Sequence, residues 1–175
     1  PLYIEPYMTQ EQIAENSYNN KRLEYAIDYQ TKRWNEYVQL KNSFDEFSYT
    51  FDFKSDSAWE FADKAVSNHN SAKSLLDTAR QELVNADLLF ENGDIESAIN
   101  TYSYTSDDLR GASNAIDAMY ENTNRAINAE KQFATLSEQQ IEEFNQEIQL
   151  QYEKDLAEYN QEIERIEAEI AELKG

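Results

Sequence analysis

Hydrophobic side chains recur at steps of three and four residues along most of the chain, which is the spacing of one face of an α-helix. Thr9 with Gln12 forms the pattern of a capping box, so a first helix is predicted from Thr9 to about residue 48. Residues 48–57 break the pattern and indicate a loop. Asp56 or Ser57 is then placed to cap a second helix.

The second predicted helix runs to Asn92 and has an unusually regular seam. Steps of four and three alternate without a fault, which is a heptad repeat. The seam comprises Ala58, Ala62, Ala65, His69, Ala72, Leu76, Ala79, Leu83, Ala86 and Phe90. Because most of these residues are alanine, we expect a partner helix to approach closely.

Asn92, Gly93 and Asp94 combine a glycine helix stop with a new N-cap, which predicts a tight helical hairpin. The helix that follows keeps the same spacing. Its seam comprises Ala98, Tyr102, Thr105, Leu109, Ala112, Ile116, Met119, Thr123, Ala126, Glu130 and Phe133. Folding about Gly93 sets residues of the two seams opposite each other: Leu76 with Leu109, Ala72 with Ala112, and His69 with Ile116.

The end of the third helix is ambiguous from the sequence. Ser137 and Gln140 can cap a fourth helix, whereas the seam continues past Ser137 with one stutter and no Gly or Pro before Gly175. The expected fold is therefore all-α: an elongated antiparallel bundle of three or four long helices with coiled-coil character, whose C-terminal helix either projects as a stalk or folds back. We divide the chain into a lead-in at 1–8, a bundle at 9–136 and an acidic coiled-coil helix at 137–175.

The first helix has two apolar faces, a pattern typical of a helix that is buried on both sides or has an unfilled partner site. One face carries Leu23, Ile27, Trp34 and Val38. The opposite face carries tyrosines interleaved with basic residues, and it is the first candidate interaction surface: Tyr18, Arg22, Tyr25, Tyr29 and Arg33.

The second candidate surface lies in the acidic C-terminal helix. From Glu138 to Lys174 there are twelve acidic and three basic residues, so about half of the net charge of −20 falls there. Its proposed contact residues are Tyr152, Tyr159, Ile163, Ile166 and Ile170. Glu162 would face Glu167 of a parallel second copy, which favours a basic or neutral partner. If the helix folds back, Lys21, Arg22, Lys32 and Arg33 offer a docking site; otherwise its glutamates form a solvated face.

Composition excludes several classes of function. A chain with 35 acidic and 15 basic residues repels nucleic acid and anionic lipid. It has no cysteine and no apolar run of the roughly 20 residues that a membrane span needs. We therefore expect a protein partner or self-association through the long helices, with no nucleic acid and no direct membrane insertion in this chain.

Candidate chemistry is sparse. His69 is the single histidine and lies in the alanine seam, where it is expected to fill space, with a pH-sensing role as the alternative. A di-iron bundle site needs two Glu-x-x-His motifs, and neither this motif nor zinc ligands are present. The stretch from Ala86 to Ile99 resembles the hairpin turn of a tetratricopeptide unit, but it occurs once, and the helices are too long for that repeat.

These observations predict a non-enzymatic structural or interaction protein without cofactors, serving as a spacer, scaffold or assembly module. The alternative is an adaptor that holds a partner helix or basic partner on the aromatic face of the first helix or on the acidic tail. Because the sequence begins at Pro1 without an initiator Met, we expect a processed form, and hence a setting in the cell envelope or a viral particle.

Overall fold

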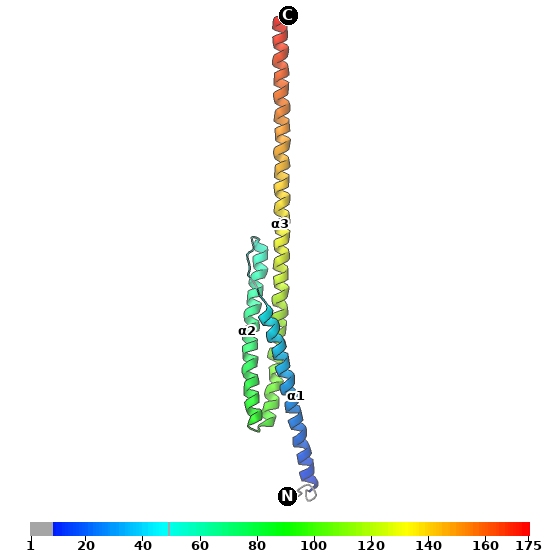
Figure 1. Cartoon of the computed structure of the whole chain (residues 1–175), viewed down its shortest axis with the longest axis vertical. Helices are drawn as coiled ribbons and strands as arrows, with labels where there is room; N and C mark the ends of the chain where they lie inside the picture. Colours follow the sequence, from blue (N-terminus) through cyan, green and yellow to red (C-terminus); the bar gives the residue numbers. More distant parts are fainter. Residues whose placement is uncertain (1–8, 49) are drawn as a thin grey trace. The chain divides into compact units, whose positions relative to one another are not determined.

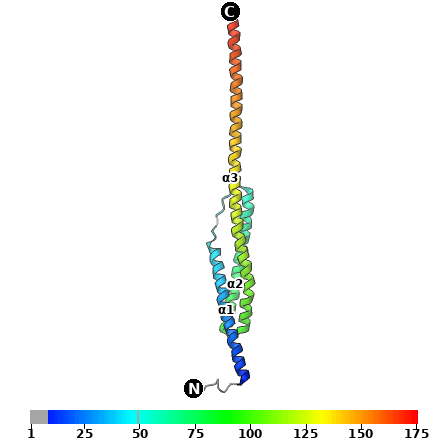
Figure 2. The same cartoon turned by 90° about the vertical axis from the view of Figure 1, so that its right-hand side faces the viewer.

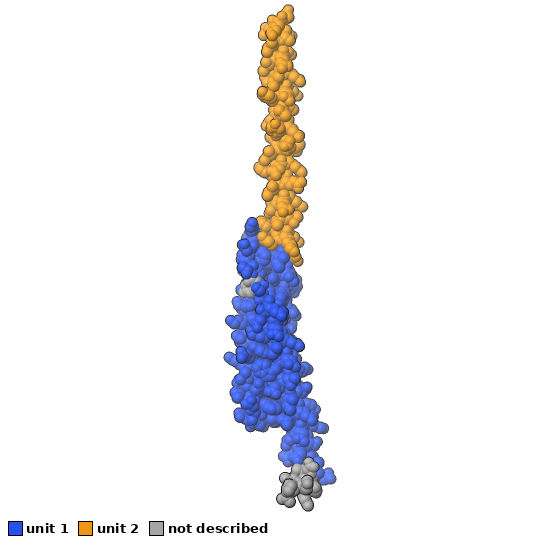
Figure 3. All heavy atoms as spheres, in the orientation of Figure 1, with its two compact units in different colours: residues 1–127 blue, residues 128–175 orange. Residues whose placement is uncertain are grey.

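The computed structural model describes residues 9–48 and 50–175, so the predicted lead-in at 1–8 lies outside the described residues. The chain divides into two units, Pro1–Ile127 and Asn128–Gly175 (Figure 3). Over the described ranges its regular structure is helical: α1 (Gln10–Glu46), α2 (Asp56–Glu91) and α3 (Ile95–Lys174), as Figure 1 shows. The prediction of an all-α fold is therefore confirmed.

The helix starts follow local hydrogen-bonding chemistry. Thr9 caps α1 with the predicted capping box, in which the Thr9 hydroxyl accepts from the Gln12 N–H and the Gln12 side chain accepts from the Thr9 N–H. The cap of α2 is Ser55, whose Oγ accepts from the Ala58 N–H at 3.3 Å. The prediction of Asp56 or Ser57 as this cap was wrong by one or two residues, because all three side chains suit the position.

The hairpin between α2 and α3 is confirmed. Gly93 adopts φ +82°, a conformation that favours glycine. Its N–H donates to the Phe90 carbonyl at 3.1 Å, and the Asp94 N–H donates to the Leu89 carbonyl at 2.9 Å. This pair of bonds is a Schellman motif, which satisfies the last carbonyls of α2 and reverses the chain.

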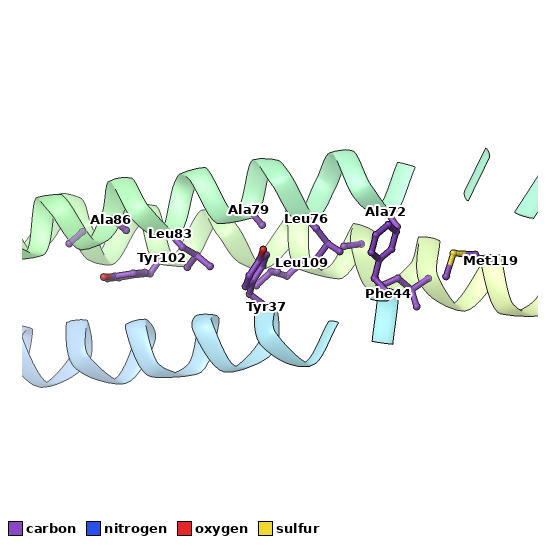
Figure 4. Packing of buried hydrophobic residues seen from close by; sticks show 13 residues of the cluster. Tyr37, Phe44, Ala72, Leu76, Ala79, Leu83, Ala86, Tyr102, Leu109 and Met119 are labelled. Carbon is purple, nitrogen blue, oxygen red and sulfur yellow. The ribbon is translucent and has the colours of Figure 1, made fainter. Parts of the chain in front are cut away.

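In the first unit, α1, α2 and the N-terminal part of α3 lie side by side in both Figure 1 and Figure 2. The predicted seam alanines and leucines of α2 are buried, and so are the seam residues of α3 from Ala98 to Ala126, apart from the half-buried Thr123. Figure 4 shows Tyr37 and Phe44 of α1 directed at this hairpin core, beside Leu76 and Leu109. The core is therefore a narrow layer of small and medium side chains closed by aromatic residues from α1.

The second unit is the part of α3 that follows Ile127. Ser137 lies inside α3, so of the two alternatives that the sequence left open, the helix that continues through this position is the one present. Side chains throughout residues 128–175 are exposed or half-buried. This segment, residues 128–174, is called the tail below.

Gly111 marks a close approach of α3 to α2. A Cβ at this position would lie 3.2 Å from Cδ1 and 3.7 Å from Cδ2 of Leu75. Glycine in a helix interior is about 1 kcal/mol less favourable than alanine, so a packing reason is expected where it occurs. The Leu75 side chain supplies that reason.

We predict that Gly111→Ala stabilises the bundle more in a Leu75→Ala background than in the wild-type chain. With Leu75 shortened, the substitution should raise the free energy of unfolding by about 1 kcal/mol, the ordinary helix-propensity difference. With Leu75 present the gain should be smaller, because the new methyl group displaces the leucine. Urea unfolding of the four proteins in this double-mutant cycle measures the difference, and equal gains in both backgrounds would contradict the close approach.

Candidate functional site

The strongest polar contact in the first unit is centred on the Asp87 carboxylate of α2. It accepts from the Gln30 side chain at 2.9 Å and from the Trp34 indole N–H at 3.1 Å, both on α1. It also accepts from the Tyr102 hydroxyl on α3. Asp87 therefore joins all three helices of the bundle. We call Gln30, Trp34, Asp87 and Tyr102 the Asp87 cluster.

Tyr102 is held in the cluster as a neutral donor. Its side chain is fully buried, and its hydroxyl donates a hydrogen bond to the Asp87 carboxylate. Burial raises the pKa of Tyr102 well above its ordinary value, and the hydrogen bond to Asp87 and the negative charge of that residue raise it further. The phenol therefore keeps its proton near neutral pH, where it donates to Asp87.

Two arginines of the predicted tyrosine face are bonded within the first unit. Arg33 donates from Nε to the Tyr102 carbonyl at 3.2 Å and pairs with Glu36 at 2.9 Å. Arg22 pairs with Glu96 of α3 at 3.5 Å. Tyr29, on the same side of α1, packs against the core. The structure thus places these three candidate residues at the contact between α1 and the hairpin.

Other apolar residues of α1 remain accessible. Tyr18 and Tyr25, the other two candidates on this helix, are more than half exposed. On a different side, Leu23, Ile27 and Val38 are 41%, 49% and 48% exposed. We call these three residues the α1 stripe. It adjoins Trp34, which is half-buried in the Asp87 cluster.

The tail carries a longer exposed apolar surface. Its residues recur at helical spacing and are exposed, except for Ile163, which is half-buried. We call the following set the tail seam: Ile141, Phe144, Ile148, Tyr152, Leu156, Tyr159, Ile163, Ile166, Ile170 and Leu173. All five candidate contact residues of the tail belong to it, so the structure brings them together on one helix.

Acidic side chains border the tail seam, and one arginine partly compensates for them. Arg165 pairs with Glu162 and, at 3.5 Å, with Glu169. Both pairs are exposed, where an ion pair contributes at most about 1 kcal/mol. Together with Lys154 and Lys174, this arginine leaves the segment from residue 138 to 174 nine charges negative.

A second polar contact, between carboxyl groups, joins α2 to α3. Glu82 lies against Asp108 and near the buried Thr105, and its Oε2 is shielded from solvent without a hydrogen-bond partner among the described residues. Burial raises the pKa of Glu82 to about 7, and the hydrogen bond to Asp108 and the charge of Asp108 add to the shift. Near neutral pH the Glu82 carboxyl is therefore partly protonated.

The single histidine takes part in the packing of the bundle, and potential metal ligands do not converge in residues 9–48 and 50–175. His69 stacks on Phe44 with ring centroids 4.5 Å apart, so its ring packs against α1. No group of three or more potential ligands converges to hold a metal within those ranges. An open groove of about 550 Å³ between α1 and α3 is lined by Arg33, Glu36, Arg110 and neutral side chains.

Sequence reasoning missed the Asp87 cluster and the Glu82–Asp108 pair. Both lie immediately beside seam positions, since Asp87 follows Ala86 and Glu82 precedes Leu83. A carboxylate next to an alanine seam is a usable signal of a contact between helices. Alanines let the partner helix approach closely, so residues beside the seam come within its reach. The donors on α1 were hidden, because Gln30 is polar and Trp34 was assigned to an apolar face on the basis of its ring, which does not reveal the role of its indole N–H.

None of the helices in the described part of the chain contains an apolar stretch long enough to cross a membrane. Comparison with protein-family models, with curated proteins and with solved structures gives no match to this chain. The functional argument therefore depends on the geometry and charge of the surfaces described above.

Asp87→Asn is predicted to destabilise the bundle by about 1–3 kcal/mol, because the amide cannot accept from all three donors and Tyr102 or Trp34 is left unpaired in a buried setting. Asp77→Asn is the matched control, since it makes the same charge change at an exposed position of α2. Urea unfolding monitored by tryptophan fluorescence measures both. Equal effects of the two substitutions would show that the cluster does not hold the helices together.

Glu82→Gln is predicted to change how stability depends on pH. The folded pKa of about 7 exceeds the ordinary value of 4.5, so between these pH values the folded chain holds a proton that the unfolded chain has released. The stability from this group is complete below pH 4.5 and is lost as the pH rises through about 7.

The Glu82→Gln chain should therefore match the wild type at pH 4.5 and exceed it at pH 8 by about 1–2 kcal/mol, a value reduced for partial exposure. Unfolding curves across this pH range make the comparison. Glu60→Gln, at an exposed position of α2, is the control. A constant difference between Glu82→Gln and wild type across the range would contradict the raised pKa.

Proposed function

We propose that this chain is a non-enzymatic assembly module that associates with a helix of another molecule through the tail seam. The observation that supports this proposal is the exposure of the seam. Nine of its ten residues are at least 44% exposed, and Leu173 is 87% exposed. A single helix with this many accessible aliphatic and aromatic residues gains stability when a second helix covers them.

The spacing of the seam favours a coiled coil as the form of this association. Leu156, Ile163 and Ile170 are seven residues apart, and so are Tyr159, Ile166 and Leu173. These two sets occupy the a and d positions of a heptad repeat, where knobs of one helix fit holes of another. Branched and leucine side chains at these positions are suited to such packing. The bundle in the first unit would then serve as the scaffold that carries the tail.

A second candidate function is an adaptor that uses the α1 stripe. Leu23, Ile27 and Val38 leave almost half of their surface accessible on a helix that is otherwise held firmly by the Asp87 cluster. A partner helix placed along α1 would cover these residues. The stripe is shorter than the tail seam and has three aliphatic residues, so we place it second.

The test measures binding of a designed helical peptide to the 175-residue chain by fluorescence anisotropy. The peptide copies residues 137–174 with four acidic residues beside the seam replaced by glutamine. It is called the Gln peptide. Its substitutions are Asp155→Gln, Glu162→Gln, Glu167→Gln and Glu169→Gln. We expect binding, accompanied by slower amide hydrogen exchange in residues 141–173 of the full chain.

Three variants of the full chain identify the surface used. The seam variant carries Leu156→Ser, Ile163→Ser and Ile170→Ser. Its matched control, at exposed tail positions outside the seam, carries Ala157→Ser, Ala168→Ser and Ala171→Ser. The stripe variant carries Leu23→Ser, Ile27→Ser and Val38→Ser.

The seam variant should bind the Gln peptide at least about tenfold more weakly, because three buried aliphatic side chains are lost. The control and the stripe variant should bind as the wild type does. Loss of binding in the stripe variant alone would favour the adaptor function. Absence both of peptide binding and of self-association by sedimentation would contradict the proposed function itself.

A further inference from the structure

We infer that the partner of the tail seam is a helix with basic residues beside its own apolar seam, and that a second copy of this chain is not that partner. The inference rests on the proposed function, because it names the chemistry of the molecule that covers the seam. It concerns the last three heptads, residues 155–174. Their geometry is regular and their flanking positions are strongly charged.

The flanking positions follow from the heptad assignment. With Leu156, Ile163 and Ile170 at a, the preceding g positions are Asp155, Glu162 and Glu169. The e positions are Asn160, Glu167 and Lys174. The g edge of the seam is therefore wholly acidic. The e edge has one neutral, one acidic and one basic residue.

An antiparallel pair of two copies is disfavoured at both edges. In that arrangement g positions meet g positions, so Asp155 faces Glu169 of the other copy and Glu162 faces its counterpart. The e positions also meet, and in the same register Glu167 faces Glu153, the e residue of the preceding heptad, on the other copy. The Asp155–Glu169 and Glu153–Glu167 contacts each occur twice, and no contact between opposite charges offsets these repulsions.

A parallel pair of two copies is disfavoured by the total charge of the segment, because its local contacts cancel. Glu162 faces Glu167 of the other copy, Asp155 faces the neutral Asn160, and Glu169 faces Lys174. The repulsive and attractive contacts balance at the flanks. The remaining term is the charge of the whole segment, which is nine negative in each copy between residues 138 and 174. Two such helices in contact lie within one Debye length over their full length, so repulsion opposes pairing.

A helix with Lys or Arg at its flanking positions removes each of these penalties. In either orientation it places a positive charge opposite Glu162, Glu167 and Glu169. The tyrosines of the seam add to the match, because Tyr152 and Tyr159 are both more than 60% exposed and offer ring faces to a neighbouring cation. Arg165 does not lie at a flanking e or g position. It pairs with Glu162 and Glu169 on its own helix.

Three peptides test the inference against the 175-residue chain, each covering residues 137–174. The Gln peptide, which has neutral residues at the four substituted positions, is the reference. The native peptide represents a second copy of the tail. The Lys peptide differs from it by Asp155→Lys, Glu162→Lys, Glu167→Lys and Glu169→Lys.

At 100 mM NaCl the Lys peptide should bind at least tenfold more tightly than the Gln peptide, and the native peptide more weakly than either. At 1 M NaCl, where the Debye length falls to about 3 Å, the three affinities should converge. Sedimentation equilibrium of the chain alone at 100 mM NaCl should give a monomer. A Lys peptide that also carries Leu156→Ser, Ile163→Ser and Ile170→Ser controls for attraction by charge alone, and it should bind at least tenfold more weakly than the Lys peptide.

The outcomes separate this inference from the proposed function. Equal binding of the Lys and native peptides, or a dimer of the chain that the seam variant abolishes, would overturn the basic partner and leave the seam as an assembly surface. Equal binding of the Lys peptide and its serine control would also overturn the inference, since charge without the seam would then suffice. Failure of all three peptides to bind a monomeric chain would overturn both proposals.

Discussion

The Asp87 carboxylate determines how α1 packs on the hairpin of α2 and α3. One buried edge of this group receives hydrogen bonds from Gln30 and Trp34 of α1 and from Tyr102 of α3. A carboxylate with three donors satisfies its lone pairs, whereas the same group with any donor removed leaves polar atoms unpaired in a setting that penalises them. Sliding α1 by one turn would separate Asp87 from both of its α1 donors. The cluster thus selects one register among several that hydrophobic contacts alone would allow.

Such selection is needed because the rest of the core is not specific. Alanines at six buried positions of α2 let α3 approach closely, but alanine side chains are alike and specify no register by shape. Larger side chains supply shape at a few points, where Tyr37 and Phe44 from α1 meet Leu76, Leu109 and their neighbours. The bundle therefore combines close, uniform packing between α2 and α3 with a polar contact that fixes the third helix.

The sequence predicted the hairpin well because its signals are local and repeated. The alternating steps of the α2 and α3 seams fix which side of each helix is buried, and Gly93 fixes where the chain turns. Prediction was weaker for α1. Its buried side is centred on Ala26, Tyr37 and Phe44 and includes Gln30 and Arg33, so it lies between the two apolar faces that the pattern shows. A hydrophobic pattern could not find it, because its polar residues are satisfied by partners from distant parts of the sequence.

The candidate surface on the tail was predictable for the opposite reason. The tail seam is exposed, so the spacing of its residues is enough to identify the apolar side of the helix. Polar contacts with distant residues, such as those of Asp87 with α1, do not alter that side. In the first unit, Arg22 and Arg33 of α1 already have partners, which are Glu96, Glu36 and the Tyr102 carbonyl. The tail has about half of the net charge and only Lys154, Arg165 and Lys174 to offset it beyond Ser137. In the proposed association, compensation sufficient to bring a second helix against this seam would come from the partner, so charge, more than apolar shape, would discriminate between partners.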